Sequence, residues 1–310
     1  VDRQVGALLK RLDDEGLADN TIVFFLGDHG RCHIRGKQFL YDGGIRIPLI
    51  MRWPGKVTPG QVSKDLVMSI DICATILEAA GISAPVPLHG KSLFSQEVKN
   101  RKHVFAARDK MDETHDSMRT IRSRDHKLIL NLMPERPWCQ YNRYKEGAYP
   151  VLAEMNVLNL KGKLTPEQAA FFAPTKPEIE LFDLRKDPHE VHNVADDPAY
   201  TKVKARLLAE LNNWRKNVIN DRGVSEDFRA REVFPAALTT NTVDDWVKEN
   251  AGKYDFNKYG WPAWYPTRTL SEWEKARAKW EPYVMRGPSE KVSRPSISHS
   301  NKKKKARKKK

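Results

Sequence analysis

The most constraining feature of this chain is a continuous apolar run at residues 21–26, TIVFFL, that ends directly in the tetrapeptide GDHG. The run is rich in branched and aromatic side chains and shows no polar alternation, so it predicts a parallel strand covered on both faces. Its carboxyl end delivers Asp28 and His29 to the crevice where open α/β sheets hold their ligands. The pattern therefore predicts an α/β fold with a functional edge at residues 27–30.

Asp28 and His29 are candidate ligands of a metal ion. The carboxylate of Asp28 offers hard oxygens that suit calcium or magnesium, and His29 offers a nitrogen or a hydrogen-bond donor. The alternative is a simple turn, in which Asp28 caps the next segment and His29 lies on the surface. The tetrapeptide alone leaves both interpretations open.

The residues that follow favour a ligand site. Lys37 comes directly after Gly36 and is followed by an aromatic stretch and the sequence YDGG at residues 41–44. Paired glycines let a backbone approach a ligand closely, and a lysine is a point charge suited to sulfate or phosphate. His33 and Arg35 lie between the two motifs, where they either face the substrate or belong to a solvated basic loop.

The stretch FFLGDHG followed by RGKQFLYDGGIRIPLIMRWPG resembles the second half of the sulfatase family, within the alkaline-phosphatase-like superfamily. The resemblance implies that Asp28 and His29 bind calcium, although many members carry Asn in place of His29, and that Lys37 contacts the substrate sulfate. It also implies part of a mixed sheet flanked by helices, with a smaller C-terminal antiparallel sheet plus helix subdomain. The segment from PERPWCQYNRYKE to LTPEQAAFFAP is similar to heparan N-sulfatase-like bacterial members.

The resemblance also implies a nucleophile that this sequence does not contain. A sulfatase uses a formylglycine made from Cys or Ser in the motif C/S-x-P/A-x-R, and the nearest match, CQYNR at 139–143, has Tyr141 in place of the small residue or proline. We therefore expect the chain to be the carboxyl-terminal portion of a longer enzyme and to be inactive alone. A single calcium ion would be shared with ligands in the missing N-terminal half.

The activity implied by the resemblance is hydrolysis of a sulfate ester, or an N-sulfate, in a sulfated carbohydrate or small sulfate ester. The implied compartment is periplasmic, extracellular or lysosomal. A phosphodiesterase or phosphatase of the same superfamily is an alternative, since those branches also use an Asp-His pair. No apolar run approaches the roughly 20 residues that a membrane-spanning helix needs.

The rest of the chain follows recognisable periodicities. Helical spacing of apolar residues predicts a first helix from the start of the chain, a second over 69–81 that packs on the sheet through Ile72 and Ile76, and a third over about 198–218. Short β-like runs between 103 and 184 are interrupted by an insertion. We expect catalytic-domain residues 1–95, a C-terminal α+β subdomain at 96–222 and an extension at 223–310.

The insertion, residues 133–177, leaves two interpretations open. Its side chains Tyr141, Arg143, Tyr144 and Lys145 either line a specificity pocket for a sulfated sugar or form an ordinary hairpin surface.

The last nine residues, KKKKARKKK, carry eight of the chain's net +14 charges, which leaves +6 for the remainder. A block of this kind binds polyanions through counterion release, so a polyanion- or nucleic-acid-binding protein is a further alternative. The simpler expectation is a solvated tail with weak heparin affinity.

Overall fold

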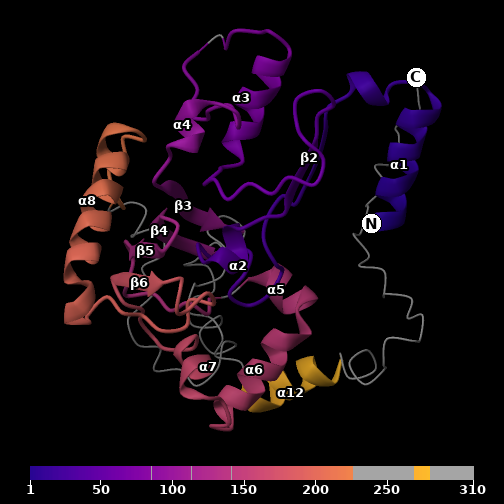
Figure 1. The fold of residues 1–310 in the computed structure, drawn as a ribbon. Helices are drawn as coiled ribbons and strands as arrows, with labels where there is room; N and C mark the ends of the chain where they lie inside the picture. The colour runs from indigo at the N-terminus through magenta and orange to yellow at the C-terminus, as the bar shows by residue number, and fades with distance from the viewer. Residues whose placement is uncertain (85, 113, 141, 226–268, 280–310) are drawn as a thin grey trace, which may run out of the picture.

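The computed structural model describes residues 1–84, 86–112, 114–140, 142–225 and 269–279 (Figure 1). The helices and strands, in chain order, are α1 (Asp2–Asp14), η1 (Ala18–Asn20), β1 (Val23–Leu26), α2 (Asp42–Ile45), β2 (Leu49–Arg52), α3 (Ile70–Ala79), α4 (Gln96–Lys99), β3 (Val104–Met111), β4 (Thr114–Arg122), β5 (His126–Asn131), α5 (Arg143–Ala148), α6 (Pro150–Leu160), α7 (Pro166–Ala170), β6 (Ile179–Asp183), η2 (Pro198–Tyr200), α8 (Thr201–Asn217) and α12 (Leu270–Ala278).

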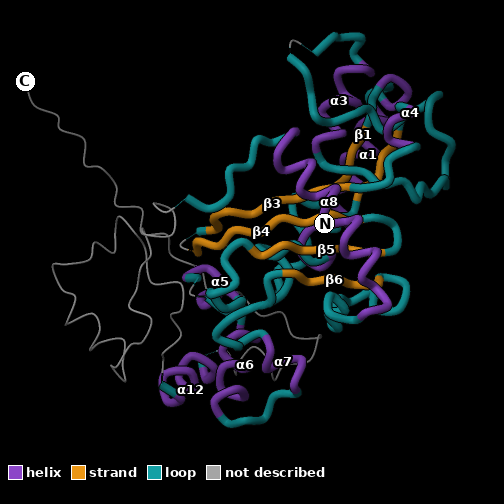
Figure 2. Tube along the Cα trace, turned by 90° about the vertical axis from the view of Figure 1, so that its left-hand side faces the viewer, coloured by secondary structure: helices purple, strands orange, loops and turns teal. Residues whose placement is uncertain are grey.

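Strands β3 to β6 form an antiparallel sheet in sequential order, which confirms the expected C-terminal sheet (Figure 2). Alternate side chains point to opposite faces, so each strand serves two hydrophobic cores. Leu128 and Leu181 face the last long helix, α8, where they pack with buried Leu207 and Leu211. The other face carries a second set of buried residues, Met118, Ile129 and Phe182, which contact Phe39 and Tyr41. The sheet therefore lies between α8 and the segment that holds the candidate site residues.

The strand after the first helix differs from the prediction. β1 pairs antiparallel with β2, with Val23 opposite Arg52 and Leu26 opposite Leu49, and its side chains are only partly buried. The expectation of a parallel strand covered on both faces is thus wrong for the residues that the structure describes. The pairing is antiparallel because the chain turns back after the loop that follows β1, and β2 then runs alongside β1. Pro48 directly precedes β2.

Helices α1 and α3 form where helical periodicity predicts them, but their packing is unusual. No residue of α1 is buried in the described part of the structure, and its Leu8 is 65 % exposed. In α3 the buried residues are the polar Asp71 and Thr75, whereas Ile76 on the predicted apolar face is 49 % exposed. The carboxylate of Asp71 pairs with Arg101 instead. Polar contacts to the 91–101 segment, rather than apolar packing on a sheet, therefore hold α3.

The insertion at 133–177 is helical, which corrects the hairpin alternative. It contains α5, α6 and α7, and α6 packs against α12 through Val157 and the buried Trp273. Most of the expected extension, including the lysine-rich tail, lies outside the described residues, as does Tyr141. Within the described residues no helix is long and apolar enough to cross a membrane.

Candidate functional site

Residues 27–48 between β1 and β2, here called the site loop, fold compactly on themselves. The backbone N–H of Gly30 donates to the carbonyl of Gly44 at 2.8 Å, and the N–H of Lys37 donates to the carbonyl of Arg31 at 2.8 Å. A Cβ on Gly30, Gly36 or Gly44 would overlap carbonyl oxygens of the same loop. These three glycines therefore allow the loop backbone to pack on itself, which corrects the expectation of close approach to a ligand at Gly44. At Gly43, where a Cβ would make an ordinary contact with the carbonyl of Arg35, that expectation stays a prediction.

Asp28 and His29 lie side by side at the start of this loop. Nδ1 of His29 is 2.8 Å from the carbonyl oxygen of Gly30, which can only accept, so the proton of the neutral imidazole belongs on Nδ1. This leaves a lone pair on Nε2, which lies 3.5 Å from Oδ2 of Asp28. The Asp28 side chain is 89 % exposed and the His29 side chain 30 % exposed. Two electron-pair donors side by side, with the imidazole oriented by a backbone carbonyl, are a donor set that fits a divalent cation.

These two residues supply only part of a coordination shell. In the described ranges no group of three or more His, Cys, Asp and Glu side chains lies close enough to hold a metal ion. Calcium takes six to eight oxygen ligands, so further ligands would have to come from elsewhere.

The three basic residues of the loop lie in different surroundings. Lys37 is half-buried, and its ammonium lies 5.0 Å from the centre of the Tyr144 ring. His33 is exposed. Arg35 contacts the loop's own supports: its Nη2 donates to the carbonyl of Glu190 at 2.6 Å, and its guanidinium lies 3.9 Å from the centre of the Tyr41 ring.

The sheet fixes the second half of the loop through Tyr41. The Tyr41 hydroxyl donates to Oε2 of Glu180 on β6 at 2.6 Å, and Oε1 of Glu180 accepts from Asn131 on β5 at 2.8 Å. Burial raises the pKa of the Glu180 carboxyl, although the hydrogen bonds from Tyr41 and Asn131 oppose that change. Burial, followed by the nearby charge of Glu180, likewise raises the pKa of Tyr41 well above its usual value.

A second anchor joins Asp42 to three other charged residues. The ammonium of Lys127 contacts the carboxylates of Asp42 at 2.5 Å and Glu190 at 2.7 Å, and Arg122 pairs with Asp42 at 3.0 Å. Burial by itself would raise the pKa of Asp42, but hydrogen bonds from Arg122 and the charge of Lys127 hold it below its ordinary value. The carboxylate of Glu190 also accepts from the Asp42 backbone N–H at 2.6 Å.

Sequence reasoning missed these anchors. Glu180 and Glu190 belong to the stretch ELFDLRKDPHE, whose sequence predicts a structural turn. Lys127 lies in a run whose sequence predicts an ordinary strand. One signal was present: a lysine in an apolar strand must find a partner when the strand is central. The sequence does not indicate that the partner is a site-loop residue 85 positions earlier.

The family model of the C-terminal part of N-sulphoglucosamine sulphohydrolase matches residues 27–165. An ulvan-active sulfatase of Formosa agariphila is 34 % identical over 246 residues, which are 79 % of this chain and 41 % of that protein. The human N-sulphoglucosamine sulphohydrolase is 26 % identical over 229 residues, which cover 69 % of this chain and 45 % of the relative. The chain thus spans less than half the length of these two relatives.

Solved structures show the same fold. A protein solved in complex with its substrate D-glucosamine-2-N,6-O-disulfate superposes with a TM-score of 0.52 at 23 % identity, covering 72 % of this chain and 40 % of its own. A 2-O GAG sulfatase gives a TM-score of 0.51 at 22 % identity, covering 74 % of this chain and 42 % of its own.

The chain belongs to the sulfatase family, of which it represents a carboxyl-terminal portion. This confirms the resemblance drawn from the GDHG and GK motifs, and the expected mixed α/β fold class agrees with the fold of these solved structures.

Proposed function

We propose that this chain forms part of a sulfatase that hydrolyses a sulfate ester, or an N-sulfate, of a sulfated sugar. The observation that carries the proposal is the pairing of the Asp28 and His29 electron-pair donors at the start of the site loop, which also presents Lys37. The sulfatases among its relatives and the sulfated ligand of the similar structure support the same class of reaction.

The proposed roles follow from the chemistry of each side chain. Asp28 supplies carboxylate oxygens to a calcium ion, and His29 supplies Nε2 while Gly30 holds its ring in place. Calcium bound there would offset the negative charge of the sulfate and orient the nucleophile. Lys37 places its ammonium beside the sulfate oxygens, whose charge changes as the bond from sulfur to oxygen or nitrogen breaks.

The other two basic residues of the loop have more limited roles in this proposal. His33 faces solvent and is free to contact the sugar. Arg35 is positioned by its contacts with Glu190 and Tyr41, so its guanidinium would reach a substrate only at the edge of the site.

The proposal requires parts that lie outside this chain. A formylglycine nucleophile and the remaining calcium ligands would come from the part of the enzyme that the longer relatives possess in addition. The compartment would be the periplasm, the exterior or the lysosome.

The test uses the complete enzyme that the proposal requires. Removing a preorganised donor costs on the order of a hundredfold to a thousandfold in turnover, so Lys37→Ala should lower kcat by that factor while calcium content stays near wild type. Asp28→Ala should lose calcium and activity together. Lys10→Ala, which removes an exposed lysine of α1, serves as the control and should change neither quantity.

Two results would contradict the proposal. Near-normal turnover of every sulfated sugar by Lys37→Ala would show that this lysine is only a surface charge. Faster turnover of phosphate mono- or diesters than of matched sulfate esters would favour the phosphodiesterase or phosphatase alternative.

A further inference from the structure

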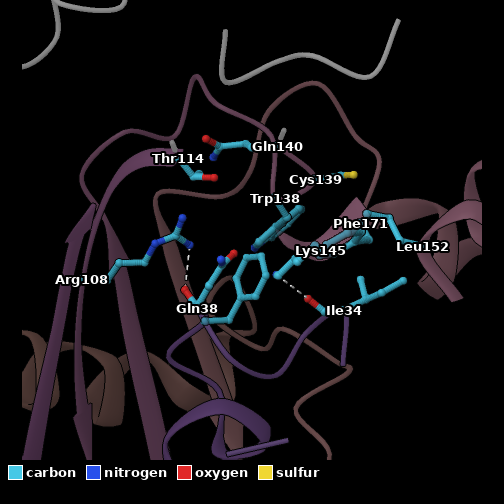
Figure 3. Close-up of a pocket in the computed structure, with 11 residues that line it drawn as sticks. Ile34, Gln38, Arg108, Thr114, Trp138, Cys139, Gln140, Lys145, Leu152 and Phe171 are labelled. Carbon is cyan, nitrogen blue, oxygen red and sulfur yellow. Dashed lines mark hydrogen bonds between the residues drawn. The ribbon is translucent and has the colours of Figure 1, made fainter. Parts of the chain in front are cut away.

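A small pocket lies between the site loop, β3 and the helical insertion, and Gln38, which directly follows Lys37 in the chain, lines it (Figure 3). Its free volume is about 10 Å³, enough for one water-sized group. The polar and charged side chains that line it are Gln38, Arg108, Thr114, Gln140 and Lys145.

Two buried cations face this space. Arg108 is 7 % exposed; its Nη1 donates to the carbonyl of Gln38 at 2.8 Å, while its Nε is buried and has no hydrogen-bond partner among the residues that the structure describes. Lys145 is 6 % exposed and donates a long hydrogen bond, 3.3 Å, to the carbonyl of Ile34. Both charges lie over the same ring of Phe39, at 5.4 Å for Arg108 and 4.5 Å for Lys145.

The nearby carboxylates that the structure describes are already engaged. Asp112 accepts from the amides of Gln38 and Asn142, at 3.1 and 3.0 Å. Asp116 pairs with Lys176 at 3.0 Å, with both side chains fully buried. Among the described residues, no carboxylate forms an ion pair with Arg108 or Lys145.

Buried charges in proteins are ordinarily paired, so two cations that share a pocket, with no ion-pair partner in the ranges that the structure describes, suit an anionic ligand. Burial, and then the charge of Arg108, lower the pKa of Lys145 to about 7. An anion in the pocket would oppose both effects by stabilising the charged ammonium.

The pocket is also next to the proposed sulfate site. Gln38, whose carbonyl Arg108 holds, directly follows Lys37 in the chain. Its φ of 85° lies in the left-handed region, which is strained for a residue other than glycine and is found at ligand-binding positions more often than elsewhere. Tyr144, whose ring Lys37 approaches, directly precedes Lys145.

We propose that Arg108 and Lys145 form a second anion-binding subsite, which takes one oxygen of a further sulfate or carboxylate on the same sugar whose scissile sulfate faces Lys37. The inference rests on the proposed function and makes it more specific: the preferred substrate carries two anionic groups. The free volume admits a single oxygen rather than a sugar ring, so the anionic group would enter only at its tip. The planar guanidinium of Arg108 suits an oxyanion, and Lys145 adds a point charge.

Calorimetric titration of the complete enzyme, with the formylglycine precursor residue replaced by Ala so that the probes are not hydrolysed, tests the subsite directly. The probes are N-acetylglucosamine 6-sulfate, with one anionic group, glucosamine 2-N,6-O-disulfate, with two sulfates, and glucuronate 2-sulfate, with a sulfate and a carboxylate. Wild type should bind at least one of the doubly charged probes ten times more tightly than the singly charged one. Preference for the disulfate identifies the second group as a sulfate, and preference for the uronate identifies it as a carboxylate.

Lys145→Met should reduce the ratio of the two affinities to below threefold. Lys163→Met, which removes an exposed lysine from the same insertion, is the matched control and should keep the full ratio. An unchanged ratio in Lys145→Met, or no preference in wild type, would overturn the subsite.

A second measurement does not depend on a folded variant. The ¹³Cε resonance of Lys145 in wild type should titrate near pH 7 and move to higher pH when the preferred probe saturates the protein; an unshifted midpoint would contradict the proposal. Failure of the subsite proposal can be distinguished from failure of the sulfatase proposal. The sulfatase proposal is tested by the turnover of Lys37→Ala in the complete enzyme, whereas the subsite is tested by binding preference and by the titration of Lys145.

Discussion

The hydroxyl of Tyr41 donates a hydrogen bond to the buried carboxylate of Glu180 at 2.6 Å, across 139 residues of sequence. This contact joins the loop that carries Lys37 to the last strand of the C-terminal sheet. The position of the candidate sulfate-binding lysine therefore depends on sheet residues that lie far from the site loop in the sequence. Charged residues on β4 and β5 add a second link through Asp42.

Removing the Tyr41 hydroxyl should destabilise the fold. Tyr41→Phe leaves Oε2 of Glu180 buried without its donor, and an unsatisfied buried acceptor costs about 1–3 kcal/mol. Urea denaturation should show a loss of that size. Tyr144→Phe, at a side chain that is 45 % exposed, should change the unfolding free energy by less than about 0.5 kcal/mol. Equal effects of the two substitutions would show that the hydrogen bond does not hold the loop.

Lys127 should be among the most sensitive positions in the chain. Its fully buried ammonium lies between the carboxylates of Asp42 and Glu190, so Lys127→Met removes the partner of the buried Glu190 and leaves Asp42 with Arg122 alone. Breaking a buried ion pair in this way costs about 3–5 kcal/mol. Lys10→Met removes an exposed pair with Asp14 and should cost no more than about 1 kcal/mol. A loss below 1 kcal/mol for Lys127→Met in thermal unfolding would refute the anchoring role.

Local periodicity was sufficient to predict much of the fold. The runs at β3 to β6 have apolar residues on both faces, and α8 has a clear apolar stripe, so element type and order follow from the sequence. The pairing of β1 was not predictable in the same way. A short apolar run looks alike in parallel and antiparallel sheets, and its direction depends on where the next strand returns.

The candidate site, like the fold, was predictable from the sequence only in part. GDHG and GK locate the proposed ligands because they lie in one continuous segment, and the resemblance to sulfatases supplies their proposed roles. The pocket at Arg108 and Lys145 was only partly foreseen: the insertion suggested Lys145 as a specificity residue, but Arg108 lies in a plain strand run. Arg108 and Lys145 are 37 residues apart in the sequence and come together only through tertiary packing, which no local sequence pattern encodes.

Glycine substitutions should separate loop packing from general backbone effects. Gly44→Ala places a Cβ against the carbonyls of Phe39 and Gly36, so the site loop must shift. The Cβ of Gly6→Ala in α1 would meet no described residue within 4 Å, and the substitution should stabilise the helix by about 0.5–1 kcal/mol. Opposite signs in the change of Tm are the expected result. A stabilising Gly44→Ala would mean that the loop is not packed on itself.

The lysine-rich tail lies outside the described residues, and the prediction for it rests on charge alone. Deleting residues 302–310 removes eight positive charges and should abolish weak, salt-sensitive retention on heparin or DNA, while the unfolding midpoint stays unchanged. Retention is measured as the salt concentration needed for elution. Sequence-selective DNA binding that survives the deletion would favour a nucleic-acid-binding function instead.

Lys145 gives the chain a specific pH dependence. Its pKa of about 7 in the folded protein lies below the value near 10.4 of an unfolded lysine. Between these values the unfolded state binds more protons than the folded state, so the free energy of unfolding rises with pH. From pH 7 to 8.5 this group alone should add about 1.5 kcal/mol, a rise that Lys145→Met should lack and that Lys163→Met should retain. Chemical denaturation of the three proteins at both pH values measures the difference. If wild type and Lys145→Met show parallel pH profiles, the ammonium of Lys145 is not held in a site that disfavours its charge.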